Sequence, residues 1–169
     1  SPHSGADYPA AFVKASRLDP VALRGSEDAF IDELFAAAPD HGAPLLSARY
    51  PRAFVDMNRE AWELDPGMFN GELPHFVNSS SPRVSGGLGT IARVVSNGAE
   101  IYSKKLPFSE AERRIRSIYM PYHNALKELI GATQAATGCA VVIDCHSMPS
   151  IGGPMDQDKG RQRADIILG

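Results

Sequence analysis

Several short apolar runs along the chain have the pattern of buried β-strands. In the most distinct one, "AVVI" is followed directly by "DCHS", so that the predicted strand ends in a group of polar residues. The runs "AFVDMN" and "TIARVV" are similar in length and contain β-branched or aromatic residues. We therefore predict strands at 53–58, 90–95 and 140–145, and a last one in "ADIILG" at 164–169.

A second pattern, with apolar residues three and four positions apart, predicts helices. One such pattern covers residues 26–38 and starts with a serine that is typical of an N-cap. A longer one starts at Ser109, where Glu112 completes a capping box, and stops at Gly138. Pro121 lies inside this long helix and should kink or divide it. Because strands alternate with helices, we expect an α/β protein.

The composition indicates one domain and excludes some partners. The chain has 169 residues, of which 43% are hydrophobic, which is enough to bury one core, and we expect residues 1–169 to form a single domain. The net charge is −3 and the basic residues are scattered, which argues against binding to nucleic acid or to an acidic membrane surface. No apolar run approaches the ~20 residues of a membrane span. The sequence leaves the oligomeric state open.

The cysteines and the chain ends bear on the cellular setting. Cys139 and Cys145 lie at opposite ends of the predicted strand 140–145, about 20 Å apart, which is too far for a disulfide. We therefore expect reduced thiols and a cytoplasmic location. The chain opens on "SPHSGADYP", without an initiator methionine, and closes on an apolar run. We expect it to be part of a longer protein.

Histidines and acids supply a candidate metal centre. Of the five histidines, His3 and His146 lie in a loop and at a strand end, where ligands bind in open α/β sheets. Glu27, Asp28 and Asp32 supply carboxylates near the start of the first predicted helix. Two histidines and one carboxylate would give zinc three ligands and leave a position for water. The same acids can instead interact with the helix dipole without any metal.

A candidate anion site lies in "PRAFVDMNRE". On a strand, Arg52, Asp56 and Asn58 would face the same side, and an arginine beside an amide suits a carboxylate ligand. A salt bridge from Asp56 to Arg52 or Arg59 is an equally good interpretation. Arg93, beside the glycine-rich "SGGLGT", is a further candidate for anion binding. That glycine stretch lacks the lysine of a P-loop and predicts a turn.

Taken together, these segments resemble one known family. "SPHSGADYP", "SEDAFIDELF", "FVDMNRE", "GLGTIARVV", "PYHNAL" and "VVIDCHSMPS" occur in the order expected for the N-formylglutamate amidohydrolase (N-formylglutamate deformylase) family. That family resembles the zinc carboxypeptidases and the aspartoacylases, in which a strand-end "DxNR" carries an Asn–Arg pair for the substrate carboxylate. The matching residues here are Asp56, Asn58 and Arg59.

The resemblance implies a fold and a metal. The implied fold is a three-layer α/β/α architecture around a mixed, mainly parallel central sheet (phosphorylase/hydrolase-like), incomplete at both termini. The implied cofactor is one Zn²⁺ per chain, held by His3, a carboxylate and His146. The sequence lacks the HxxE spacing of the carboxypeptidases, and we favour Asp28 as the carboxylate over Glu27 and Asp32.

The resemblance also implies a reaction, the hydrolysis of N-formyl-L-glutamate to formate and L-glutamate by metal-activated water. This substrate is a small dicarboxylate amide. Asn58 with Arg59 would bind one of its carboxylates, and Arg52 or Arg93 the other. The family's usual setting is histidine degradation. The alternatives are an amidohydrolase of the same superfamily that acts on another N-acyl amino acid or a cell-wall peptide, and a non-catalytic relative that binds an acidic metabolite.

One catalytic group is not found in the sequence. The related carboxypeptidases use a glutamate as general base, placed well after the last zinc histidine. No glutamate follows His146, and the acids that do follow it are Asp156, Asp158 and Asp165. We therefore expect the general base to lie beyond Gly169.

Overall fold

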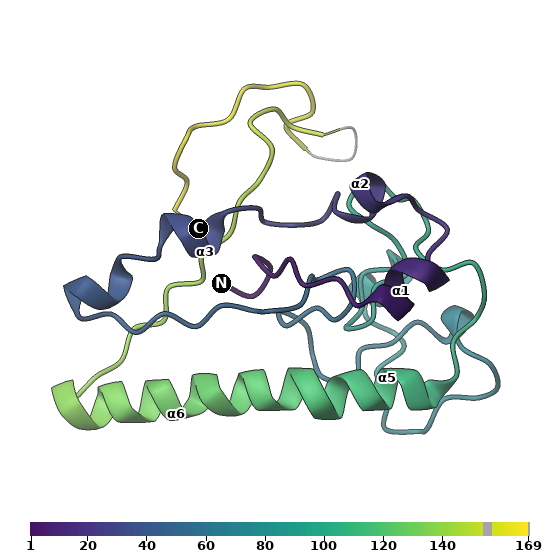
Figure 1. Ribbon diagram of the computed structural model, residues 1–169, viewed down its shortest axis with the longest axis horizontal. Helices are drawn as coiled ribbons and strands as arrows, with labels where there is room; N and C mark the ends of the chain where they lie inside the picture. Colours follow the sequence, from purple (N-terminus) through teal and green to yellow (C-terminus); the bar gives the residue numbers. More distant parts are fainter. Residues whose placement is uncertain (154–156, 169) are drawn as a thin grey trace.

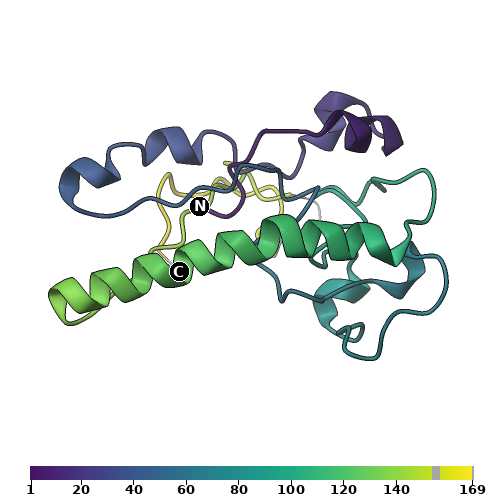
Figure 2. The same ribbon diagram turned by 60° about the horizontal axis from the view of Figure 1, so that its bottom comes forward.

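The dominant element of the structure is a long helical rod (Figure 1). The computed structural model describes residues 1–153 and 157–168. The rod consists of α5 (Phe108–Arg114), a π-helical turn η3 (Ile115–Tyr119) and α6 (Met120–Thr137). The first hundred residues are irregular segments joined by short helices; in Figure 2 the purple segments lie above the rod, and blue-to-teal segments reach below its right-hand end. These short helices are α1 (Ala10–Ala15), α2 (Pro20–Leu23), α3 (Ile31–Leu34), η1 (Ala38–His41), η2 (Pro66–Met68) and α4 (Pro82–Ser85).

The rod confirms the predicted end and division of the long helix. Gly138 follows α6 in the left-handed conformation, with φ 83°, which glycine adopts without a steric penalty. The π-helical turn η3 ends just before Pro121. Proline has no N–H to donate to the carbonyl four residues before it, so a change of helical type at this point accommodates it.

The predicted capping box at the start of the long helix is wrong. The helix starts at Phe108, directly after Pro107, and no side chain caps it. Ser109 is therefore already inside the first turn, where its hydroxyl cannot act as the N-cap. Glu112 forms an ion pair with Arg116 one turn later, at 2.9 Å, instead of reaching back to the helix start.

The hydrophobic core lies where α5 and η3 meet the loops of the first half of the chain. Arg114 is buried there, and its Nη1 donates to the carbonyl of Phe54 (3.0 Å) and to the hydroxyl of Tyr102 (2.7 Å). Its guanidinium also lies 4.0 Å from the centre of the Phe54 ring. These contacts fix the segment that carries Asp56. The fully buried apolar side chains include Leu23, Val55, Leu64, Phe69, Ile91, Val95, Ile101 and Ile115.

Two further contacts attach the same segment to the rod. The hydroxyl of Tyr119 donates to the carbonyl of Arg59 (2.6 Å), and Nε2 of His123 lies 2.9 Å from the carbonyl of Met57. Both side chains come from the part of the rod around Pro121, where the helix changes from π to α. The residues after Asp56 are therefore held from the helix side, which leaves their other side for the site described below.

The predicted central sheet is wrong for the described residues. They contain isolated β-bridges but no sheet. In the segment 53–58, the N–H of Phe54 turns back to the carbonyl of Pro51 (2.9 Å). In the segment 90–95, the N–H of Val95 turns to the carbonyl of Ala99 (3.0 Å). The N–H of Asp56 does reach the carbonyl of Thr90 (2.8 Å), which joins the two segments, but among the described residues no ladder of such bonds continues along them. A mainly parallel α/β/α sheet therefore does not form here.

The predicted buried strand at 140–145 is also wrong. The segment is extended, but no backbone–backbone hydrogen bond joins it to another described residue. Val141 is 84% exposed and Ile143 is 77% exposed. The segment faces α6 across a cavity of about 430 Å³ instead of packing against a neighbour. The predicted strand at 164–169 is likewise absent over residues 164–168, whose apolar side chains are exposed, and Gly169 lies outside the described residues.

The predicted helix at 26–38 is reduced to the single turn of α3. Phe30, directly before α3, has φ 64°, a left-handed conformation that is unfavourable for a bulky residue and interrupts a right-handed helix. The hydroxyl of Ser26 accepts from the N–H of Ser96 (2.8 Å), so it does not cap a helix. Only Ile31 of the predicted apolar face is buried. The turn that carries Asp28 is therefore shaped by tertiary contacts and not by a helix.

The described helices and cysteines agree with two simpler expectations. None of the helices in the described part of the chain is long and apolar enough to cross a membrane. Cys139 and Cys145 are both free thiols, as predicted.

Candidate metal centre

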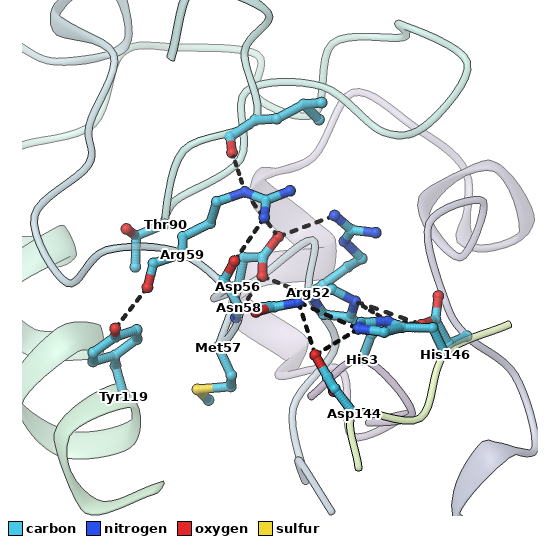
Figure 3. Close-up of polar contacts among 12 residues, drawn as sticks. His3, Arg52, Asp56, Met57, Asn58, Arg59, Thr90, Tyr119, Asp144 and His146 are labelled. Carbon is cyan, nitrogen blue, oxygen red and sulfur yellow. Dashed lines mark hydrogen bonds and ion pairs between the residues drawn. The ribbon is translucent and has the colours of Figure 1, made fainter. Parts of the chain in front are cut away.

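Three side chains from distant parts of the sequence converge at one point. Nδ1 of His3 lies 3.2 Å from Nδ1 of His146 and 3.5 Å from Oδ2 of Asp28. Nδ1 of His146 lies 2.7 Å from the same carboxylate oxygen. Figure 3 shows the two imidazole rings side by side. Two nitrogens and one oxygen therefore surround a common point.

Local structure explains how each ligand reaches this point. The N–H of Asp28 donates to the carbonyl of His3 (3.2 Å), which joins the N-terminal segment to the turn before α3. The N-terminal segment passes very close to the loop at 49–50. A Cβ on Gly5 would clash with the carbonyl of Tyr50, so only glycine permits this approach. His146 comes from the extended segment after α6, which lies over the first two ligands.

The three atoms fit a zinc ion. Zinc in proteins prefers four tetrahedral ligands at about 2.0–2.1 Å, which places neighbouring ligand atoms roughly 3.3 Å apart. The separations of 3.2 Å and 3.5 Å match this spacing, and the 2.7 Å contact between Asp28 and His146 is somewhat shorter. Two imidazoles and one carboxylate also leave one position open, which is the arrangement of catalytic zinc sites.

The other carboxylates proposed for the metal lie elsewhere. Glu27 is turned away from the histidines and forms an ion pair with Arg24 at 2.9 Å. Asp32 lies in α3 and is not part of the group of potential ligands found among the described residues. Of the three candidates, the structure brings only Asp28 to His3 and His146.

Asp56 orients the first histidine. Its Oδ1 lies 2.7 Å from Nε2 of His3, the ring nitrogen opposite the common point. Oδ1 also accepts from the N–H of Asn58 (2.8 Å), and Oδ2 accepts from Arg52 (3.1 Å) and lies 3.7 Å from Arg59 (Figure 3). Since a carboxylate only accepts hydrogen bonds, Nε2 of His3 carries a proton, which leaves Nδ1 as the nitrogen that would present a lone pair to a metal at the common point.

Burial and charge shift the ionisation of these groups. Burial alone would raise the pKa of Asp56, but His3, Arg52 and Arg59 outweigh it and lower that pKa to about 2. Burial would likewise raise the pKa of Asp28, yet contacts with His3 and His146 lower it. Burial lowers the pKa of His3, but the two aspartates together raise it above its ordinary value. These shifts favour ionised carboxylates at Asp28 and Asp56 and a positive charge on the groups between them.

The predicted anion-binding residues divide into two groups. Asn58, Arg59 and Arg52 lie beside the metal candidates, as Figure 3 shows. Arg59 is partly committed to the fold, because its Nε donates to the carbonyl of Leu88 (2.8 Å) and its Nη1 to the carbonyl of Asn58 (2.6 Å). The structure confirms the salt bridge between Asp56 and Arg52 that the sequence allowed.

Arg93 is not brought to this cluster. Its guanidinium pairs with Asp65 at 2.8 Å and with Glu100 at 3.6 Å. It lines a separate surface hollow together with other basic residues, among them Arg17 and Lys104.

One residue at the site was missed in the sequence. Oδ2 of Asp144 lies 2.9 Å from Nε2 of His146 and accepts from Nδ2 of Asn58 (3.2 Å). The signal that could have found it is its position two residues before His146, because in an extended segment such residues face the same side.

Two imidazoles and a carboxylate with a free fourth position define a candidate centre of the kind found in metal-dependent hydrolases. The family model for N-formylglutamate amidohydrolase matches residues 1–169, and the chain belongs to this family.

Individual relatives agree with the family. The N-formylglutamate deformylase of Pseudomonas aeruginosa is 25% identical over 151 residues, which cover 88% of this chain and 50% of that protein. The N-formylglutamate deformylase of Pseudomonas putida is 25% identical over 125 residues, covering 73% of this chain and 41% of that protein. The crystal structure of N-formylglutamate amidohydrolase from Ralstonia eutropha JMP134 superposes with a TM-score of 0.81 at 37% identity, over 89% of this chain and 52% of that one. The chain thus spans about half the length of these relatives.

Proposed function

We propose that the protein hydrolyses N-formyl-L-glutamate to formate and L-glutamate at one Zn²⁺ held by His3, Asp28 and His146, with residues 1–169 acting as a single catalytic domain. The observation that carries the proposal is the convergence of two histidine Nδ1 atoms on one aspartate oxygen. The names of the matched relatives support the substrate. We also propose a cytoplasmic location, which the free thiols of Cys139 and Cys145 support.

The residues of this chain have distinct tasks in the proposed reaction. When bound, zinc supplies a Lewis acid for the formyl oxygen and a water of lowered pKa. His3 and Asp28 are buried and approach the common point from the protein side. His146 is partly exposed, with 33% of its side chain accessible, so the substrate would approach from this side. Asp56 keeps the Nδ1 lone pair of His3 aimed at the common point.

Arg52, Asn58 and Arg59 would recognise the carboxylates of the substrate. Arg52 uses one guanidinium nitrogen for Asp56, and its side chain is only partly buried, so other N–H groups can reach a ligand. The amide of Asn58 is exposed beside His146. Charge-assisted hydrogen bonds contribute about 1.5–3 kcal/mol each, which would favour a dicarboxylate over an uncharged formamide.

The general base is proposed to come from beyond Gly169. Of the acids that follow His146, Asp158 is engaged by Arg163 at 2.6 Å. Asp165 is exposed, and Asp156 lies outside the described residues. Because the chain spans about half the length of its relatives, this proposal concerns the whole protein.

The test combines metal content with turnover. Elemental analysis of the whole wild-type protein, including the segment beyond Gly169, should give one zinc per chain, and formate should be released from N-formyl-L-glutamate. His146→Ala should lose both. Asp40→Asn, a change at an exposed aspartate of η1 that takes no part in the cluster, serves as the matched control and should keep both. In the whole protein, zinc without formate release would contradict the proposed substrate, and full activity in a metal-free sample would contradict the zinc centre.

A further inference from the structure

The second histidine of the metal centre has a carboxylate of its own. Asp144 places Oδ2 2.9 Å from Nε2 of His146, on the side of the ring opposite the common point. Asp56 does the same for His3, at 2.7 Å. The two pairs come from different parts of the chain, but in each the outer ring nitrogen meets a carboxylate and Nδ1 faces Asp28.

The ring of His146 lies between two carboxylates, since Nδ1 is 2.7 Å from Oδ2 of Asp28 and Nε2 is 2.9 Å from Oδ2 of Asp144. With a metal ion at the common point, Nδ1 must present its lone pair, and one consistent proton assignment remains. Nδ2 of Asn58 lies 3.2 Å from both Oδ2 of Asp144 and Nε2 of His146. If Nε2 carried no proton, its lone pair would face the carboxylate lone pairs at 2.9 Å, which is repulsive. If Nε2 carries the proton, Asp144 accepts from both His146 and Asn58. The lone pair of His146 then lies on Nδ1, where a metal needs it.

We propose that Asp144 is a positioning residue that selects the metal-binding tautomer of His146, while Asn58 holds the Asp144 carboxylate in place. The proposal rests on the proposed function, because it presupposes the metal site. The inference also extends the proposed function, because it assigns a role to Asp144 and gives Asn58 a second role besides contact with the substrate. The segment 140–146 lacks backbone hydrogen bonds to the other described residues. Side-chain contacts of this kind therefore have to fix the ring of His146.

The task of Asp144 differs in one respect from that of Asp56. Asp56 is buried and is neutralised by two arginines, whereas 48% of the Asp144 side chain is exposed. Removal of Asp144 therefore leaves no buried charge unpaired and should not disturb the core. This makes the residue accessible to a test that separates positioning from folding.

The experiment measures metal affinity directly, without substrate. Co²⁺ is titrated into the metal-free full chain and followed by visible absorption, and Zn²⁺ affinity is obtained by competition. Asp144→Ala should bind both ions 10- to 100-fold more weakly, the range seen when such outer carboxylates are removed. Asp144→Asn should lie between the wild type and the alanine variant, because its amide oxygen accepts the same hydrogen bond without the charge. Asp40→Asn should match the wild type.

The controls separate the possible failures. If His146→Ala abolishes Co²⁺ binding while Asp144→Ala binds within twofold of the wild type, the metal centre stands and the role of Asp144 is overturned. If His146→Ala binds as tightly as the wild type, the proposed centre itself is overturned. Circular dichroism and the melting temperature of the metal-free variants show whether they are folded. Should the alanine variant be unfolded, wild-type affinity in Asp144→Asn would overturn the inference.

Discussion

Oδ1 of Asp56 lies 2.7 Å from Nε2 of His3, and both side chains are almost completely buried. The same carboxylate is held by Arg52 and by the N–H of Asn58. Asp56 thus connects the candidate metal centre to the segment proposed to bind the substrate. A change at this one residue should affect stability and metal binding together.

Asp56→Asn should lower the free energy of unfolding by roughly 3 kcal/mol, because it removes the negative charge from a buried group that faces His3 and two arginines. Urea denaturation of the metal-free protein measures this directly. Asp40→Asn, an exposed change of the same chemistry, should alter stability by less than about 0.5 kcal/mol. A loss below about 1 kcal/mol in Asp56→Asn would show that the charge network is not important for stability.

Stability should depend on acid pH through the same residue. The folded protein lowers the pKa of Asp56 from 3.8 to about 2, so Asp56 is more easily ionised when folded than when unfolded. Its contribution is therefore complete above about pH 5 and is lost as the pH falls toward 2, by roughly 2 kcal/mol in total. Denaturation of the metal-free wild type and of Asp56→Asn between about pH 2 and 6 tests this. Identical pH dependence in the two proteins would contradict the assignment.

Arg52→Lys should raise the KM for N-formyl-L-glutamate by roughly tenfold or more, because a lysine keeps the charge beside Asp56 but not the guanidinium fork that binds carboxylates. Steady-state formate release measures the effect, with kcat and KM determined separately. Arg93→Lys is the matched control, since Arg93 pairs with Asp65 and Glu100 away from the cluster. Equal KM values for the two variants would remove Arg52 from the substrate site.

Two glycines of the rod should respond in opposite directions to the same substitution. Gly131 lies inside α6 with open space where a Cβ would extend, so Gly131→Ala should stabilise the protein by about 0.5–1 kcal/mol. Gly138 ends α6 with φ 83°, so Gly138→Ala should destabilise it by about 1 kcal/mol. Thermal denaturation of both variants provides the comparison. A stabilising Gly138→Ala would mean that α6 continues past residue 138.

The long helix was predictable because its signals are local. Gly138 stops the helix through its own backbone preference, and Pro121 interrupts the hydrogen bonding within a few residues of itself. The start was misplaced, because Pro107 before Phe108 is as compatible with a helix start as a serine cap. The helix at 26–38 failed for a non-local reason, since Ser26 is bonded to Ser96 in a distant part of the chain.

The sheet was not predictable from the apolar runs alone. Such runs show that a segment is apolar, but a sheet needs a continuous ladder of backbone bonds between neighbours. In 53–58 and 90–95 the backbone groups are divided between local turns and single long-range bonds, such as the one from the N–H of Asp56 to the carbonyl of Thr90. The candidate site was more predictable than the fold. His3 and His146 were identifiable as polar residues at a loop and at the end of an apolar run, and the resemblance to a family singled them out.

Residue identity and short spacing were enough to single out the two histidines of the candidate site, the family to which the chain belongs and the end of the long helix. They were not enough to establish which carboxylate joins the histidines. Glu27 and Asp28 are neighbours in the sequence, yet one faces Arg24 and the other faces His3 and His146. Contacts between distant segments of the folded chain set that direction, and no local pattern contains them.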